Sequence, residues 1–285
     1  MPSSFGLWFS AYAESLADDL ELLASAFQIA NQNPLGSAAG YGSSFPLNRQ
    51  MTTGLLGFNN MNYNVVYAQM GRGKVEKIVS FALANIAATL AKLAFDVCLF
   101  MSQNFGFVSL PPEFTTGSSI MPHKKNPDVF ELVRAKCNKI QGFPAQISLI
   151  INNLPSGYFR DLQVVKEVYL PVFKELNDCL SITALAMPQL KVNKNILEDK
   201  KYDYIFSVEE VNRLVLSGVP FREAYKIVGE KIESGEYAPD KKVNHSHEGS
   251  IGNLCLDEIS NKKAETVKKF QFGKIEKAIN QLINS

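Results

Sequence analysis

The longest periodic pattern in the chain runs from Lys74 to Phe105, where apolar residues recur at helical spacing with many alanines between them. A helix that is apolar nearly all round must be surrounded by other helices. A membrane span is the alternative, but Asn85, Lys92 and Asp96 interrupt the apolar stretch, and charges in lipid are costly. The pattern therefore predicts the centre of a helical bundle and no membrane partner.

Three further patterns predict the other long helices of this bundle. They run from Phe5 to Ile29, from Asp128 to Asn152 and from Asp161 to Met187, the last with a kink at Pro171. All are much longer than the ~11 to 12 residues of an average globular helix. The sequence thus predicts an all-α fold whose long helices form an antiparallel bundle.

Shorter helical patterns follow in the last third of the chain. Ser207–Glu210 has the spacing of a capping box, and helices are predicted over Phe221–Ile232 and Leu256–Phe270. Two domains are therefore predicted: a central helical-bundle domain over residues 1–190 and a small C-terminal helical domain over residues 191–285.

Composition limits the class of partner. A chain of 285 residues with 46% hydrophobic content can bury a large core. Its 29 basic and 28 acidic residues give a net charge of only +1, which argues against nucleic acid and favours a small molecule or a protein. The cysteines lack metal-ligand spacing, and no secretory signal opens the chain, so reduced, buried thiols in a cytoplasmic protein are predicted: Cys98, Cys137, Cys179 and Cys255.

The segment from Gly117 to Pro127 combines reactive side chains with a flexible backbone: Gly-Ser-Ser-Ile-Met-Pro-His-Lys-Lys-Asn-Pro. Its final proline suits the start of the next helix, whose free N–H groups favour negative charge. The hydroxyl of Ser118 or Ser119 would be activated by a nearby ammonium group, which Lys124 or Lys125 supplies. The pattern predicts an anion-binding catalytic loop, although a solvated Gly/Ser loop with incidental lysines fits the pattern alone equally well.

This segment resembles the signature of the fumarase and aspartase superfamily, Gly-Ser-Ser-x-Met-Pro-x-Lys-x-Asn. Its continuation, Lys124 to Asp128 and then Glu131 to Arg134, is most similar to that of argininosuccinate lyases. The block from Tyr158 to Glu167 also resembles their Tyr-x-x-Asp-Leu-Gln-x-x-Lys-Glu segment. The resemblance implies a homotetramer of long helices that eliminates fumarate from argininosuccinate, giving arginine, without metal or organic cofactor.

The resemblance also implies roles for the signature residues. Ser118 matches the base that removes a proton from the carbon next to a carboxylate, and Lys124 and Asn126 match residues that bind that carboxylate. Glu131 matches the carboxylate that orients the family's catalytic histidine. The alternatives are a turn serine for Ser118 and a helix-dipole partner for Glu131.

A second set of residues matches side chains that hold the amino-acid end of the substrate. Tyr158, Gln163 and Lys166 belong to it, and a spacing of three predicts that Gln163 and Lys166 share one helix face. A solvated polar face is the alternative. Arg72 lies near a substrate-contacting arginine of the family, but in a glycine-flanked form that departs from the usual Arg-Asp. Weaker matches are Ser37 and Arg49.

The catalytic acid has no counterpart in this sequence. In relatives, the helix that residues 5–29 resemble follows a Thr-His-x-Gln segment carrying the acid histidine. The histidines of this chain lie elsewhere: His123 in the signature, where the lyase usually has Gln, and His245 and His247 in a late loop. The resemblance therefore implies the C-terminal two thirds of such a lyase, its bundle domain truncated at the N-terminus and the isolated chain nearly inactive.

Other interpretations remain open at this point. A non-catalytic assembly or structural protein would keep the bundle and the loop, as the lens crystallins related to this lyase illustrate. Adenylosuccinate lyase shares the loop but is not expected to share the block from Tyr158 to Glu167. Whether the substrate is free or N-acylated argininosuccinate does not follow from these residues.

Overall fold

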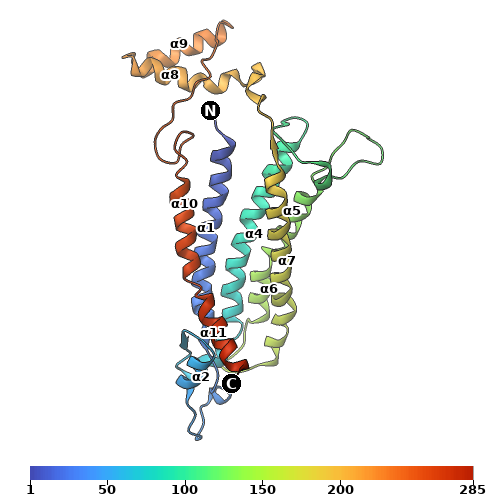
Figure 1. Cartoon of the computed structure of the whole chain (residues 1–285), viewed down its shortest axis with the longest axis vertical. Coiled ribbons are helices and arrows are strands. Elements are labelled where there is room, and N and C mark those ends of the chain that lie inside the picture. The colour runs from blue at the N-terminus through green and yellow to red at the C-terminus, as the bar shows by residue number, and fades with distance from the viewer. Residues whose placement is uncertain (285) are drawn as a thin grey trace.

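A bundle of long helices forms the middle of the elongated molecule (Figure 1), and the all-α prediction is confirmed. The structure is a computed structural model and describes residues 1–284. Its helices are α1 Phe5–Ala30, α2 Arg49–Leu55, α3 Val65–Met70, α4 Lys74–Met101, α5 Asp128–Ile140, α6 Phe143–Ile150, α7 Val165–Ala186, α8 Ser207–Leu216, α9 Phe221–Glu233, α10 Leu256–Lys268 and α11 Phe272–Ile283. Its short strands pair β1 Gln32–Asn33 with β2 Asn60–Met61 in parallel and β3 Val108–Ser109 with β4 Lys191–Val192 in antiparallel.

Helix α4 forms the centre of the bundle, where α1, α5, α6 and α7 pack against it. Its apolar side chains enter one continuous core that also holds residues of α5, α6's first turn and α7. By length and composition α4 would suffice to cross a membrane, but most of it is buried among these neighbours. We therefore interpret α4 as the core helix of the bundle, as the sequence pattern predicts.

The single helix predicted from Asp128 to Asn152 is wrong, because the chain breaks it into α5 and α6. The break falls at Gly142, whose N–H bonds to the carbonyl of Lys139 in a tight turn (3.0 Å). Pro144 then occupies the first turn of α6, where its missing N–H costs nothing. The predicted start at Asp161 is also too early for an α-helix, because a 3₁₀-helix precedes α7.

The predicted capping box at Ser207–Glu210 does not form. A 3₁₀-helix over Lys200–Phe206 leads directly into α8, so Ser207 already has helical dihedral angles (φ −59°, ψ −35°). A capping serine needs an extended backbone to direct its hydroxyl at the N–H groups of the first turn. Helix α8 instead begins as a continuation of the preceding turn.

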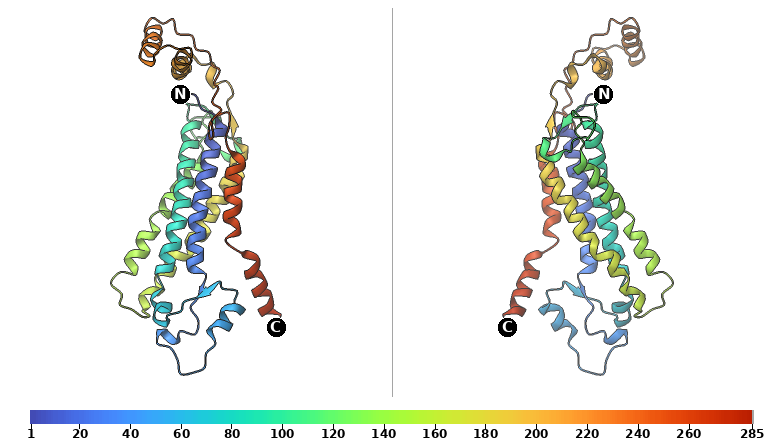
Figure 2. Two further views of the ribbon diagram at one scale, coloured as in Figure 1. Left: turned by 90° about the vertical axis from the view of Figure 1, so that its left-hand side faces the viewer. Right: turned by 90° about the vertical axis from the view of Figure 1, so that its right-hand side faces the viewer.

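The C-terminal helices divide between two places. Helices α8 and α9 form a hairpin with its own small core at one end of the bundle, around Val211, Ala224 and Val228. Helix α10 then returns along α1 (Figure 2), held by polar contacts such as that between Lys262 Nζ and Asp18 Oδ1 (2.6 Å). Helix α11, which we did not predict, packs on the loop after α2, where Lys274 Nζ donates to the Phe58 carbonyl (3.2 Å) and to Asn59 Oδ1 (2.8 Å). The domain boundary at residue 190 stays a prediction.

Two of the four cysteines predicted to be buried, Cys137 and Cys179, lie buried between α5 and α7. Cys98 and Cys255 are only half-buried, so the prediction is wrong for these two. Burial raises the pKa of Cys137 from 9.0 to about 12. In the unfolded chain the thiol ionises at its ordinary value, so in this pH range unfolding releases a proton. The free energy of unfolding should then fall by up to ~1.4 kcal/mol per pH unit for this group as pH rises from 9.0 towards about 12.

Chemical denaturation as a function of pH would measure this slope. We expect Cys137→Ala to be less stable at neutral pH, because it leaves a cavity, but to lose less stability as the solution becomes alkaline. Cys255→Ala, which removes a half-buried thiol from a loop, is the matched control. An unchanged slope in Cys137→Ala would contradict the assignment to this thiol.

Candidate active site

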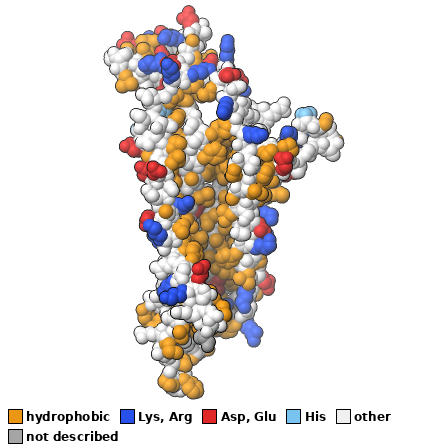
Figure 3. Space-filling model, viewed as in Figure 1, with side chains coloured by type: hydrophobic (Ala, Val, Ile, Leu, Met, Phe, Trp, Pro, Cys, Tyr) orange, Lys and Arg blue, Asp and Glu red, His pale blue; other side chains and the backbone are white. Residues whose placement is uncertain are grey.

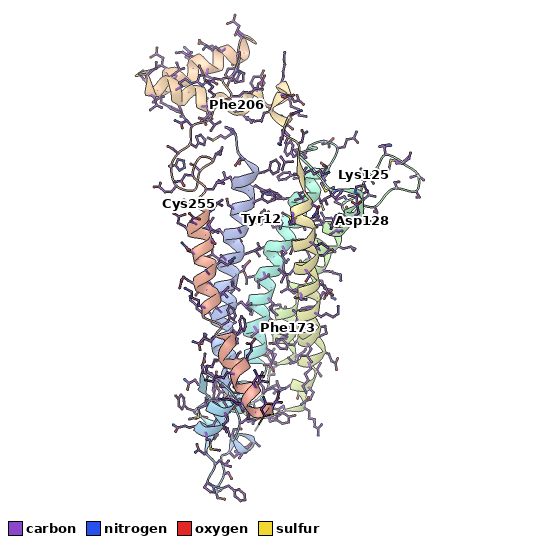
Figure 4. All side chains as sticks on the ribbon, viewed as in Figure 1. Tyr12, Lys125, Asp128, Phe173, Phe206 and Cys255 are labelled. Carbon is purple, nitrogen blue, oxygen red and sulfur yellow. The ribbon has the colours of Figure 1, made fainter. Side chains whose placement is uncertain are left out.

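The signature segment forms a loop that projects from the bundle just before α5 (Figure 1). In Figure 4, Lys125 lies out on the loop and Asp128 lies at its base. Ser119, His123, Lys124 and Lys125 are exposed, and Ser118 is half-buried. The chain therefore presents the charged side chains of the signature to solvent, where a ligand can reach them.

The hydroxyl oxygen of Ser118 accepts two backbone hydrogen bonds within the loop. The donors are the N–H groups of Met121 (3.1 Å) and Ile120 (3.3 Å). This is the geometry of a turn serine, which the sequence left as an alternative. The same geometry favours a base, because two N–H dipoles directed at the oxygen stabilise negative charge on it as its proton leaves.

Asn126 joins the two ends of the loop. Its N–H donates to the carbonyl of Thr116 (2.8 Å), the N–H of Thr116 donates back (3.1 Å), and its side-chain amide lies 3.5 Å from the carbonyl oxygen of Gly117. Ser118, Lys124 and Asn126 are thus held in one small loop.

Glu131 lies one turn into α5, exposed and near the C-terminal part of α4. Burial is the main cause that raises the pKa of the Cys98 thiol on α4, and the Glu131 carboxylate adds to it. Among residues 1–284 no histidine pairs with Glu131: His123 is on the loop, His247 is in the late loop, and His245 bonds to Glu209 (2.9 Å). Its role in orienting a histidine stays a prediction.

The second set of predicted residues lies where α6 connects to α7. Gln163 Nε2 donates to the hydroxyl of Tyr158 (2.6 Å), so the structure brings these two side chains together. Gln163 ends the 3₁₀-helix Arg160–Gln163, whereas Lys166 belongs to the first turn of α7. The prediction that both lie on one helix is therefore wrong, although they remain neighbours in the chain.

Arg72 reaches the same end of the bundle from the start of α4. Its guanidinium pairs with Glu76 (3.5 Å) and lines a cavity of about 150 Å³ together with Phe159 and Leu162. Gly73 lets the backbone here pack closely against Ile151, because its φ is +79° and a Cβ at this position would lie 2.5 Å from the Ile151 side chain. The glycine-flanked form of the motif thus has a packing reason.

The two weakest matches have structural roles in the loop region before α3. The Arg49 guanidinium donates to the carbonyls of Leu35 (2.9 Å), Asn62 (2.6 Å) and Tyr63 (3.2 Å). Ser37 accepts a hydrogen bond from the Gln69 amide (3.0 Å). Both side chains hold this segment together.

The two sets of residues lie at opposite ends of the bundle (Figure 1). Arg72 precedes the first residue of α4, while Arg134, one turn beyond Glu131, lies over the ring of Phe95 near the other end of α4. A helix of 28 residues is ~42 Å long. One small ligand cannot contact the loop and Tyr158 of the same chain, and sequence motifs did not reveal this separation.

Comparisons with known proteins agree with this fold. A family model described as "Lyase" matches residues 1–142. An argininosuccinate lyase of Parabacteroides distasonis is 67% identical over 284 residues, which cover 100% of this chain and 64% of that protein. An argininosuccinate lyase of Bacteroides thetaiotaomicron is 67% identical over 283 residues, 99% of this chain and 64% of that protein.

A solved structure of EDDS lyase in complex with formate has the same fold, with a TM-score of 0.79 at 23% identity, over 98% of this chain and 63% of that chain. The chain spans 64% of the length of the two curated relatives. Over residues 1–142 it matches the lyase family model, and the curated relatives to which it is 67% identical are argininosuccinate lyases.

Proposed function

We propose that this chain supplies part of the active site of an enzyme that eliminates fumarate from argininosuccinate and releases arginine. The observation that carries the proposal is the exposed signature loop, in which Ser118 Oγ accepts two N–H bonds and which also carries Lys124 and Asn126. The relatives at 67% identity support this substrate over adenylosuccinate and over a purely structural role. As a biosynthetic enzyme of this kind, the protein would act in the cytoplasm.

In the proposed reaction, Ser118 first loses its hydroxyl proton to solvent, and the N–H groups of Ile120 and Met121 stabilise the alkoxide. This alkoxide then removes the proton from the carbon next to a carboxylate of the succinyl group. The resulting dianion needs fixed positive charge and donors, which Lys124 and Asn126 provide. The C–N bond then breaks, and the leaving guanidino nitrogen takes a proton from an acid. No described residue is placed to supply this proton. In the lyases that the sequence resembles, the acid is a histidine in a segment that has no counterpart here.

A second copy of the chain completes the site in this proposal. The residues that hold the amino-acid end, Tyr158, Gln163 and Lys166, lie too far from the loop of their own chain. Figure 3 shows apolar side chains along the length of the bundle, and large ones are exposed on several helices: Leu22, Phe81, Phe95, Leu170, Phe173 and Leu185. We infer that copies of the chain pack through these apolar faces into a homotetramer. This assembly would bring the signature loop of one copy next to Tyr158, Gln163 and Lys166 of another.

Reconstitution tests the proposal. Alone, the 285-residue chain is expected to release fumarate at least ~10² to 10⁴-fold more slowly than an intact relative, because it lacks a general acid. Addition of the part of the P. distasonis relative that has no counterpart here should restore fumarate absorbance with argininosuccinate. Restored turnover only with adenylosuccinate would contradict the substrate assignment, and no turnover in a stable complex would favour the structural role.

A further inference from the structure

We propose that Thr116 and Asp128 form a clamp that closes the neck of the signature loop and thereby positions its catalytic side chains. The neck comprises Thr116, Asn126 and Asp128. The hydroxyl of Thr116 donates to Oδ2 of Asp128, in addition to the two backbone bonds between Thr116 and Asn126. The clamp itself follows from this geometry alone, whereas its effect on turnover rests on the proposed function.

The clamp joins the loop to the rigid part of the molecule. Asp128 is the first residue of α5, and its neighbour Phe130 is fully buried in the main core. Thr116 lies on the other side of the loop, after the 3₁₀-helix Pro112–Phe114. The bond between the Thr116 hydroxyl and the Asp128 carboxylate therefore anchors the N-terminal end of the loop to α5, which the core holds in place.

The closed neck limits the positions that the side chains of the loop can reach. Nine residues, Gly117 to Lys125, lie between the bridged residues Thr116 and Asn126. Two backbone bonds alone leave a short bridge that frays easily in water, since a net hydrogen bond contributes only ~0.5–1.5 kcal/mol. A third bond to a carboxylate strengthens the closed neck. Thr116 and Asp128 are thus positioning residues that act through Ser118, Lys124 and Asn126.

Trypsin cleavage of the native chain measures opening of the loop without any need for activity. Lys124 and Lys125 are exposed on the loop, and mass spectrometry can follow hydrolysis after each of them. Thr116→Val keeps the side-chain shape and the backbone bridge but removes the donor. We expect Thr116→Val, which lacks the donor, and Asp128→Ala, which lacks the acceptor, each to accelerate cleavage at these lysines by about three- to tenfold, the effect of one lost hydrogen bond.

The double variant and two controls separate the clamp from other effects. Because both substitutions break the same bond, the double variant should be cleaved no faster than the faster single variant. Thr116→Ser should behave as the unchanged chain. Thr115→Val, which removes a neighbouring hydroxyl bonded to the Pro112 carbonyl (3.3 Å), should leave cleavage unchanged. Additive effects of the two substitutions, or unchanged cleavage in both single variants, would overturn the clamp.

Turnover gives a second, independent result. In the reconstituted assembly, Thr116→Val should lower kcat by about three- to tenfold with little change in KM, and Thr116→Ser should restore it. Faster cleavage with an unchanged kcat would overturn the positioning role. If reconstitution gives no activity with any variant, the proposed function fails while the cleavage experiment still decides the clamp.

Discussion

Replacement of Ser118 with alanine is expected to lower kcat of the reconstituted assembly by ~10² to 10⁴-fold, the usual contribution of a general base. The alanine cannot accept the substrate proton, and it also removes the acceptor for the N–H groups of Ile120 and Met121. A fumarate absorbance assay with saturating argininosuccinate measures the effect.

Ser119→Ala is the matched control, because it removes an exposed hydroxyl from the adjacent position. We expect it to change kcat by less than about tenfold, well short of the loss of a general base. A Ser118→Ala assembly that retained near-normal turnover would contradict the role of this hydroxyl. A large effect in Ser119→Ala with none in Ser118→Ala would move the base to the neighbouring residue.

Phe130→Ala should have the largest effect on stability, lowering the free energy of unfolding by ~3–5 kcal/mol. The Phe130 side chain is 0% exposed and belongs to the main core with α4, so its removal leaves a cavity that the surrounding helices cannot close. Denaturant titration followed by circular dichroism measures the change. Lys136→Ala on an exposed position of the same helix should stay within about 0.5 kcal/mol.

The long helices were predictable because periodicity is a local signal. The pattern from Phe5 to Ile29 corresponds to α1, and that from Lys74 to Phe105 corresponds to α4 with four residues too many at its end. The break between α5 and α6 was not predictable from periodicity, because apolar residues continue in phase on both sides of Gly142. The capping box failed because a 3₁₀-helix, which has no strong sequence signal, already occupies the position before α8.

The residues that make up the signature loop were predictable from the sequence, whereas their roles stay predictions and their arrangement was not predictable. A short motif fixes the composition of the loop around Ser118, and the structure confirms that the loop is exposed. Sequence motifs do not show how far apart their residues lie in the fold. Here a helix of 28 residues, ~42 Å long, separates the two sets of side chains. The hydrogen bond between Thr116 and Asp128 was also not predictable from the sequence, because both residue types are common in turns.

A mixture of two inactive variants tests the central claim most directly, namely that the loop of one chain and the residues near Tyr158 of another share one site. Reconstituted Ser118→Ala and Lys166→Ala assemblies would be prepared separately, dissociated, mixed and reassembled. We expect the mixture to release fumarate much faster than either parent, because some sites then combine an intact loop with an intact Lys166. Activity no greater than the average of the two parents would contradict the shared site.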